Sequence, residues 1–405
     1  MMVGEDMKKT TLKKPNPIIF GILKVCSWFL NTFYYRLKIE RNDLKRAGKG
    51  RKVIICNHES KIDFYSIYQA TKGRPHMVVS NSFLRSMKIG PLMKSIGCIG
   101  KNQFQTSVAD MRAMRDVLDN DRQLIFYPAG LMAEIGLPTP IPKATGKTVK
   151  WFDADIYVGK VSGTYLSNPK WAKIKRRGKV TLNVYKLFTR EQLATLPAEE
   201  VHKAVCENLY FNAYADNLSK GVEFKNGDNL EGLENVLYKC PNCKEEYTVR
   251  AKGNVMFCDK CGYSVLGNKV GTLTQNGDIP LVYQMPNNWY NFIEEGVMKE
   301  VELEGFKLFS KAEFHKINDK KHCFEYIGEG TIALDKENFY LNGKLYGERF
   351  EKTIYAQNFP ILPFIPGKHF EVQDGKDIYR VYLEKPEQTM RWILALKYVY
   401  RLANK

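Results

Sequence analysis

Short apolar runs alternate with helical patterns over the first half of the chain. Val53-Ile54-Ile55 is a continuous β-branched run, which is typical of a strand buried on both faces. A second apolar run at Leu124–Tyr127 predicts another buried strand. Residues 63–71 and 107–120 show the 3.6-residue period of helices. Strands that alternate with helices predict a layered α/β domain, which we place at residues 53–225.

The most apolar stretch of the chain lies before this domain, at Ile18–Tyr35. Within it, Lys24, Ser27 and Asn31 recur at helical spacing and form one narrow polar stripe. That pattern is typical of a helix lying in the membrane interface, and a basic arm precedes it within residues 1–52. Two alternatives stay open. The helix could be buried against the domain, or it could span a bilayer, for which about 20 apolar residues suffice.

The last third of the chain has the pattern of a small β domain. Residues 269–296 have the composition of a linker, and residues 297–405 contain short strand patterns that end in an amphipathic helix with Trp392. Asn-Gly at 342–343 and Asp-Gly at 374–375 are turn signals between strands. The arrangement resembles a PH- or GRAM-like barrel closed by its C-terminal helix. A generic small β domain with a closing helix is the alternative.

Nine cysteines are present, and four of them form two Cys-x2-Cys pairs separated by fourteen residues. Two thiolates from each pair can complete a tetrahedral zinc site that has no open position, so the zinc would be structural. The spacing predicts a zinc ribbon at residues 236–268, whereas a redox pair is the weaker alternative. The predicted Zn²⁺ ligands are Cys240, Cys243, Cys258 and Cys261.

The net charge and the other cysteines indicate which partners and which cellular compartment to expect. The formal net charge of +18 favours an anionic partner, which could be a nucleic acid, an acidic membrane surface or a phosphorylated substrate. The five remaining cysteines are scattered singly along the chain, which indicates a reducing compartment. We therefore expect a protein at the cytoplasmic face of a membrane, peripheral or monotopic.

Candidate chemistry stands where the first predicted strand meets the first predicted helix. His58 lies in the short loop, Ser60 is a candidate N-cap, and Asp63 lies in the first helical turn. Asp63 could then orient one ring nitrogen of His58 and leave the other to accept a proton, as in a general base. No Gly-x-Ser-x-Gly motif supplies a separate nucleophile. The plain alternative is a Ser–Asp helix cap beside a surface histidine.

The run Asn57-His58-x-Ser60-x-x-Asp63 resembles the signature block of the phospholipid/glycerol acyltransferase (PlsC-like) family. Three further runs resemble that family's later blocks and follow in the same order, and the resemblance covers roughly residues 15–220. These runs are Ile96–Asn102, Leu124–Gly130 and Gly163–Tyr165.

The resemblance implies transfer of a fatty acyl group from an acyl thioester, on coenzyme A or acyl carrier protein, to a hydroxyl. The acceptor would be a lysophospholipid or glycerol phosphate, with 1-acylglycerol-3-phosphate as the default. His58 would be the general base and Asp63 its orienting partner. Backbone N–H groups near Gly130 could bind the oxyanion. The substrate-binding residues implied at the matched blocks are Asn57, Ser60, Lys101, Asn102, Pro128 and Gly130.

The sequence also departs from the family's pattern. The second block normally carries an arginine, where this chain has Lys101, Asn102 and Gln103. The third block normally carries glutamate and arginine, where this chain has alanine and apolar residues. Because those charged residues bind the acceptor's phosphate in the family, the acceptor stays open. A non-catalytic lipid-binding adaptor with the same fold is one alternative function. A nucleic-acid-binding zinc-ribbon protein is another, which the apolar N-terminal helix opposes.

Overall fold

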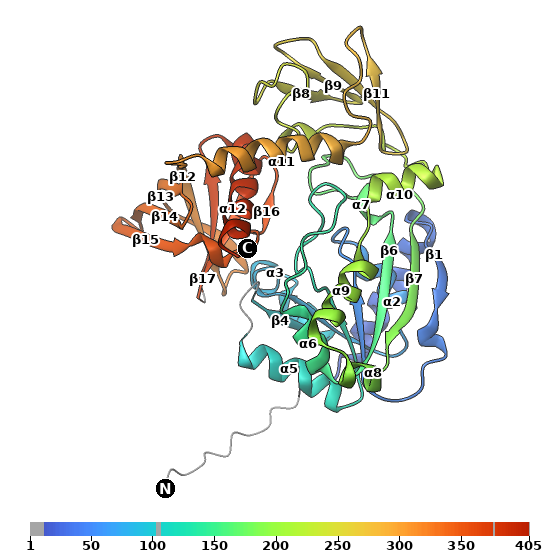
Figure 1. Ribbon diagram of the computed structural model, residues 1–405. Coiled ribbons are helices and arrows are strands. Elements are labelled where there is room, and N and C mark those ends of the chain that lie inside the picture. The colour runs from blue at the N-terminus through green and yellow to red at the C-terminus, as the bar shows by residue number, and fades with distance from the viewer. Residues whose placement is uncertain (1–11, 103–106, 376, 405) are drawn as a thin grey trace.

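The computed structural model describes residues 12–102, 107–375 and 377–404 of the chain (Figure 1). Three parts follow one another: an α/β domain, a small four-stranded sheet, and a β domain that holds the C-terminal helix. The beginning of the predicted basic arm and Gln103 lie outside the described residues.

A seven-stranded sheet forms the centre of the α/β domain, in the order β1-β7-β6-β2-β5-β3-β4. β6, β2, β5, β3 and β4 run parallel, whereas β7 is antiparallel to β6 and parallel to β1. The strands are β1 (Lys38–Asn42), β2 (Lys52–Cys56), β3 (His76–Ser80), β4 (Cys98–Lys101), β5 (Gln123–Phe126), β6 (Asp155–Ser162) and β7 (Thr181–Phe188). The sequence pattern placed the start of this domain at residue 53. Because β1 belongs to the sheet, the domain begins earlier than that.

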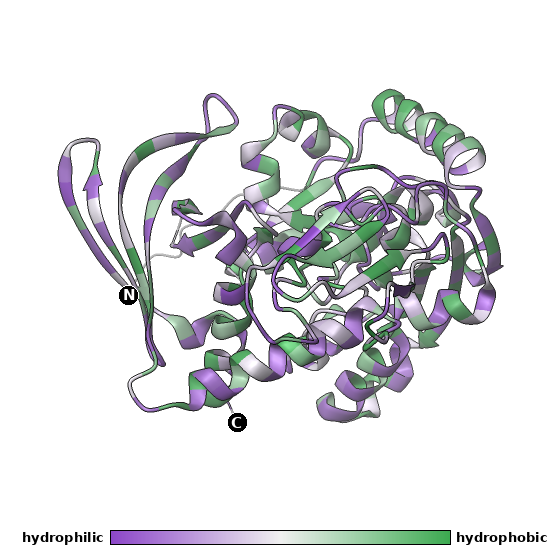
Figure 2. Ribbon diagram, turned by 90° about the horizontal axis from the view of Figure 1, so that it is seen from above, coloured by the Kyte–Doolittle hydropathy of each residue, from purple (hydrophilic) through white to green (hydrophobic). Residues whose placement is uncertain are grey.

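Both faces of the sheet are covered, which explains the continuous apolar run in β2. Val53 and Ile55 point into one apolar cluster, and Ile54 points into the other. Figure 2 shows these central strands in green, the colour of apolar residues. The helices that follow the strands are α2 (Asp63–Ala70), α3 (Asn81–Ser86), α4 (Gly90–Ser95), α5 (Val108–Asp119), α6 (Thr145–Phe152), α7 (Thr164–Ser167), α8 (Arg190–Thr195), α9 (Ala198–Leu209) and α10 (Ala213–Lys220).

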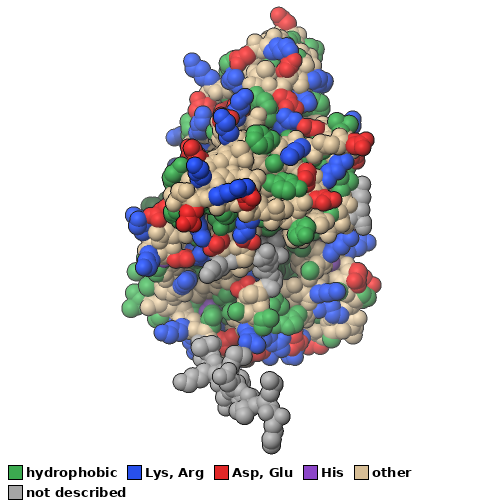
Figure 3. Space-filling model, turned by 90° about the vertical axis from the view of Figure 1, so that its left-hand side faces the viewer, with side chains coloured by type: hydrophobic (Ala, Val, Ile, Leu, Met, Phe, Trp, Pro, Cys, Tyr) green, Lys and Arg blue, Asp and Glu red, His purple; other side chains and the backbone are tan. Residues whose placement is uncertain are grey.

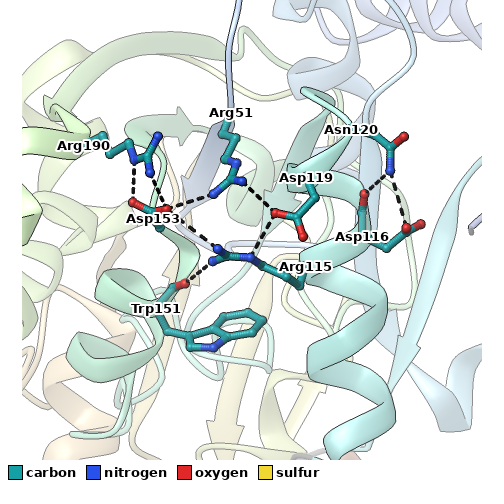
Figure 4. A network of polar contacts seen from close by, with 8 residues as sticks. All are labelled: Arg51, Arg115, Asp116, Asp119, Asn120, Trp151, Asp153 and Arg190. Carbon is teal, nitrogen blue, oxygen red and sulfur yellow. Dashed lines mark hydrogen bonds and ion pairs between the residues drawn. The ribbon is translucent and has the colours of Figure 1, made fainter. Parts of the chain in front are cut away.

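Ion pairs hold the amino-terminal edge of the sheet (Figure 4). Arg51 precedes β2 and lies 2.8 Å from Asp119 at the end of α5 and 2.8 Å from Asp153 after α6. Arg115 bridges the same two carboxylates, and Arg190 at the start of α8 also pairs with Asp153. These ion pairs connect helices of one layer at the edge of the sheet where β2 begins. The opposite edge, where the parallel strands end, is free of this network.

The N-terminal helix α1 (Pro17–Phe29) continues as a π-helical turn, Leu30–Tyr34, and its polar stripe faces the domain. Asn31 Nδ2 donates to Tyr65 O at 2.8 Å, and Lys24 Nζ donates to Thr71 O at 2.8 Å. The opposite face carries six apolar side chains that are 52–73% exposed: Ile18, Ile22, Val25, Trp28, Phe29 and Phe33.

The alternative of a helix buried against the domain is therefore wrong for this apolar face. Pro17–Tyr34 is the one helix among the described residues that is long and apolar enough to cross a membrane, and 17% of it is buried.

The four-stranded sheet follows the α/β domain in the order β11-β10-β9-β8. Its strands are β8 (Val249–Lys252), β9 (Val255–Cys258), β10 (Ser264–Gly267) and β11 (Leu273–Asn276). β11 pairs with β10, and helix α11 (Pro286–Glu302) extends past residue 296. The prediction of a linker at 269–296 is therefore wrong. The reason is that Trp289, Ile293, Val297 and Val301 recur every four residues and form one buried helical face.

The C-terminal part is a seven-stranded antiparallel sheet in the order β15-β14-β13-β12-β18-β17-β16. Its closing helix carries Trp392, which stacks on Phe339 and Phe370 at centroid distances of 6.3 and 6.2 Å. The elements are β12 (Leu308–Asn318), β13 (Cys323–Leu334), β14 (Asn338–Leu345), β15 (Glu348–Tyr355), β16 (Phe364–Ile365), β17 (His369–Asp374), β18 (Asp377–Leu383) and α12 (Thr389–Ala403).

One turn prediction in this part is wrong. Asn342 and Gly343 lie inside β14, and the chain reverses at Tyr346-Gly347. The physical reason is close strand approach, because a Cβ on Gly343 would lie 2.4 Å from the carbonyl oxygen of Glu329 on β13. Glycine here permits two backbones to come together rather than a reversal.

The C-terminal part packs against the α/β domain. Ser82 Oγ on α3 donates to Glu371 at 2.6 Å, and Arg85 pairs with Asp319 at 2.6 Å. One apolar cluster also runs from Tyr165 through Cys240 and Trp289 to the C-terminal helix. On the face seen in Figure 3, lysine and arginine alternate with acidic side chains and do not form one continuous basic patch.

Candidate active site

The loop after β2 is held in place by the neighbouring strand. Asn57 Nδ2 donates to the carbonyl of Val161 on β6 at 2.8 Å, and the N–H of Val161 donates to Asn57 Oδ1 at 2.8 Å. On the other side, the Ala133 N–H donates to the carbonyl of His58 at 2.9 Å. The backbone that carries His58 is therefore fixed from two directions.

His58 and Asp63 contact each other directly. His58 Nδ1 lies 2.9 Å from Asp63 Oδ2, with 21% of the histidine side chain and 1% of the aspartate side chain exposed. Asp63 Oδ2 also accepts the Ser60 N–H at 3.0 Å. Such a contact holds a proton on Nδ1, so that Nε2 is the nitrogen that can accept one.

Ser60 does not cap helix α2. The residue before the helix is Ile62, and no side chain caps it. Ser60 Oγ instead donates to the carbonyl of Asn168 at 3.0 Å. The prediction of a Ser60 N-cap is wrong because the Asp63 carboxylate turns back to the Ser60 N–H and supplies the local hydrogen bond.

Two further polar residues lie behind Asp63, and the sequence pattern assigned no role to either. Thr164 Oγ1, at the start of α7, lies 2.5 Å from Asp63 Oδ1 and 3.0 Å from Glu59 Oε2. Glu59 is buried and also accepts the Tyr165 N–H at 3.0 Å. Glu59 lies inside the motif and Thr164 inside a matched block, so proximity to those motifs was the available signal.

The third matched block forms a wall beside the histidine. The Tyr127 ring lies 4.4 Å from the His58 ring, measured between centroids. Pro128 follows it, and the Gly130 N–H donates to the Tyr127 carbonyl at 3.0 Å in a turn where Gly130 has φ +69°. Of the backbone N–H groups near Gly130 that were suggested for an oxyanion, that of Gly130 itself is thus engaged in this turn.

Residues 36–150 match the family model described as Acyltransferase. These residues therefore form an acyltransferase domain within the longer chain. No curated protein matches the chain.

Two solved structures are similar at low identity. The 1-acyl-sn-glycerophosphate acyltransferase PlsC from Thermotoga maritima is 17% identical, with a TM-score of 0.38, over 46% of this chain and 75% of that one. The Ran binding domain of Nup2 from Ashbya gossypii is 14% identical, with a TM-score of 0.20, over 23% of this chain and 92% of that one. The likeness to acyltransferases therefore rests on the family match at residues 36–150.

The second matched block of the acyltransferase domain lies further along the same edge of the sheet. Lys101 ends β4, which is separated from β2 by β5 and β3, a distance of about 14 Å at three strand spacings. Lys101 Nζ donates to the Asn102 carbonyl at 3.2 Å, and Asn102 Oδ1 accepts from Asn81 at 2.7 Å. Burial lowers the pKa of Lys101, and nearby Asp110 opposes that shift. The structure therefore does not place Lys101 or Asn102 against His58.

The four predicted metal ligands come together at the four-stranded sheet that follows the α/β domain. Their Sγ atoms all lie within 4.8 Å of one another. Cys240 and Cys261 are 3.7 Å apart, and Cys243 and Cys258 are 3.8 Å apart. Four thiolates at the usual Zn–S bond length would stand about 3.8 Å apart in a tetrahedron. The donor set therefore fits a zinc ion.

Proposed function

We propose that the protein transfers a fatty acyl group from acyl-CoA or acyl carrier protein to a hydroxyl of a lysophospholipid or glycerol phosphate. His58 is the general base. The observation that carries this proposal is the 2.9 Å contact between His58 Nδ1 and the buried Asp63 carboxylate. Because Nδ1 is held by a carboxylate, Nε2 is left to take the proton from the acceptor hydroxyl.

The reaction balances with these two residues. As Nε2 takes the proton, the hydroxyl oxygen forms a bond to the thioester carbonyl carbon, and a tetrahedral oxyanion results. Collapse of that oxyanion breaks the carbon–sulfur bond, and the proton on His58 passes to the departing thiolate. Asp63 stabilises the imidazolium that exists between these steps. No enzyme nucleophile is required, because the substrate hydroxyl attacks directly.

We take 1-acylglycerol-3-phosphate as the default acceptor, with Lys101 as the group that meets its phosphate. This assignment is supported by the position of a half-buried cation on the edge of the sheet where His58 also lies. Lys101→Ala should raise the KM for phosphate-bearing acceptors and leave that of uncharged monoacylglycerol unchanged. Equal changes for both acceptors would remove Lys101 from the phosphate site.

The deciding experiment is an acyl-transfer assay with a panel of acceptors and donors, in which the products are identified by mass. His58→Ala should lower kcat by about 10²–10⁴, the usual worth of a positioned acid–base group. His315→Ala is the matched control, because its side chain is also 21% exposed but lies on β12. A wild-type protein without transfer on any acceptor would favour the adaptor alternative. Full activity of the His58 variant would contradict the mechanism.

We also propose that the cysteine group holds one structural Zn²⁺, which supplies folding energy to its small sheet. Purified protein should then contain about one zinc per chain, and Cys258→Ser should lose it. Cys323→Ser, outside the group, should retain it. Because Cys240 and Cys258 belong to the same apolar cluster as Trp289, loss of zinc should also loosen helix α11. Native protein without zinc would refute the proposal.

The α1 helix is proposed to rest on the cytoplasmic surface of a membrane. Its outward apolar face and its inward polar stripe support this placement. An Ile22→Lys/Phe29→Lys variant should lose binding to vesicles of phosphatidylglycerol and phosphatidylcholine. Leu303→Lys/Phe309→Lys adds the same charge at two side chains that are each 64% exposed, and it should still bind. Equal binding of both variants would rule out α1 as the anchor.

A further inference from the structure

Thr164 stands between two carboxyl groups, but its hydroxyl has a single proton to donate. The oxygen lies 2.5 Å from Asp63 Oδ1 and 3.0 Å from Glu59 Oε2, and all three side chains are buried. If both carboxyl groups were ionised, one of these short contacts would join two oxygens without a hydrogen between them. A second proton on one of the two carboxyl groups gives each contact a hydrogen of its own.

The surroundings show which carboxyl group that is. Asp63 Oδ2 already contacts His58 Nδ1 and accepts the Ser60 N–H, so its oxygens serve as hydrogen-bond acceptors. Glu59 is 2% exposed and has no ion pair among the described residues. Burial and the nearby Asp63 charge raise the pKa of Glu59 to about 8, and the Tyr165 N–H and the Thr164 hydroxyl only partly offset them. The extra proton therefore belongs on Glu59.

We propose that Glu59 is a positioning residue of the acyltransferase, which donates as a neutral acid to the Thr164 hydroxyl so that this hydroxyl donates to Asp63 Oδ1. The inference rests on the proposed role of His58. A chain of hydrogen bonds then runs from Glu59 through Thr164 to Asp63. It fixes the plane of the Asp63 carboxylate and leaves Oδ2 directed at His58.

This arrangement also keeps a single negative charge beside His58. Two acidic groups, Asp63 on α2 and Asp216 on α10, both oppose the ionisation of Glu59. When Glu59 does lose its proton, Thr164 can donate to only one of the two carboxylates. Asp63 Oδ1 then competes with the ionised Glu59 for that one hydrogen and is held less firmly, so acyl transfer should slow as the pH rises through about 8.

Three variants test the chain of hydrogen bonds. Thr164→Val removes the hydroxyl and should lower kcat about ten- to a hundredfold, the worth of one hydrogen bond to a charged group, with KM little changed. Thr164→Ser restores the hydroxyl and should recover most of the loss. Glu59→Gln can still donate to Thr164, but the donating atom can no longer accept the Tyr165 N–H. It should lose less activity than Thr164→Val, and its rate should no longer fall above pH 8.

A second measurement does not depend on activity. Infrared spectra of the wild-type protein at pH 6 should contain the carbonyl stretch of a buried un-ionised carboxylic acid, absent from Glu59→Gln. If that band is absent from the wild type, or if Glu59→Gln keeps both the band and the alkaline fall in rate, the inference is overturned. If the band behaves as expected in a protein without acyl transfer, the inference about Glu59's proton is upheld, and the proposed function is what fails.

Discussion

Two buried glutamates of this protein have opposite protonation. Glu59, beside the candidate active site, and Glu134, at the contact with the C-terminal part, are 2% and 6% exposed. Burial and the neighbouring Asp63 raise the pKa of Glu59 to about 8. Burial alone would also raise the pKa of Glu134, but Lys397 and the Tyr290 hydroxyl outweigh it and hold that pKa below its ordinary value. Neighbouring groups, and not depth in the molecule, decide the charge.

The charge of each glutamate suits the contacts that it makes. Glu134 follows Ala133, whose N–H holds the His58 carbonyl, so an anchored carboxylate there connects the candidate active-site loop to the C-terminal helix. Lys397 Nζ lies 3.6 Å from Glu134 and 3.0 Å from Glu294 on α11. A charged pair can fix two parts of a chain against each other, whereas a neutral acid can donate a hydrogen bond. Three substitutions test whether Glu134 is charged and Glu59 neutral.

Lys397→Met should have the largest effect. It leaves Glu134 buried beside a second carboxylate without its cation, and breaking such a pair costs about 3–5 kcal/mol of unfolding free energy. Lys311→Met is the matched control, because Lys311 and its partner Glu384 are 73% and 56% exposed. Exposed pairs are worth about 0–1 kcal/mol. Denaturant unfolding of both variants decides the point. Similar losses would show that the buried pair is no stronger than the exposed one.

Glu134→Gln should cost less, about 1–3 kcal/mol, because Lys397 keeps Glu294 and only one buried polar contact is lost. Combined with Lys397→Met, the loss should be smaller than the sum of the two single losses, since the two residues share one interaction. A double-mutant cycle from the same unfolding curves measures this coupling. Strict additivity would contradict a direct pair between Glu134 and Lys397.

Glu59→Gln should have the smallest effect at neutral pH and the clearest dependence on pH. The pKa of Glu59 rises from the ordinary 4.5 to about 8, so the stability that its proton contributes is complete below pH 4.5 and is lost as the pH rises through 8. At pH 5 the variant should be about 1 kcal/mol less stable than the wild type, for one lost hydrogen bond. Between pH 5 and 8 this difference should shrink and reverse. Parallel stability curves would show that Glu59 is ionised in the native protein.

Local sequence patterns were sufficient to predict contacts between residues that are close along the chain. His58 and Asp63 are five residues apart, so a strand, a short loop and one helical turn are enough to bring them together. The two Cys-x2-Cys pairs each form within one turn, and the hairpin β8–β9 places them side by side. In both cases the geometry follows from backbone preferences over a few residues.

Contacts between segments that are distant in the sequence could be identified only from the folded structure. Thr164 and Glu59 are 105 residues apart, and Lys397 and Glu134 lie in the last and the first third of the chain. No spacing in the sequence therefore indicates either contact. The same holds for Gly343, a turn signal that became a point of close strand approach, because only the pairing with β13 shows what lies opposite it. Whether a buried carboxyl group is charged is likewise decided by partners that folding brings from elsewhere, since the local sequence specifies the acid but not the cation or donor beside it.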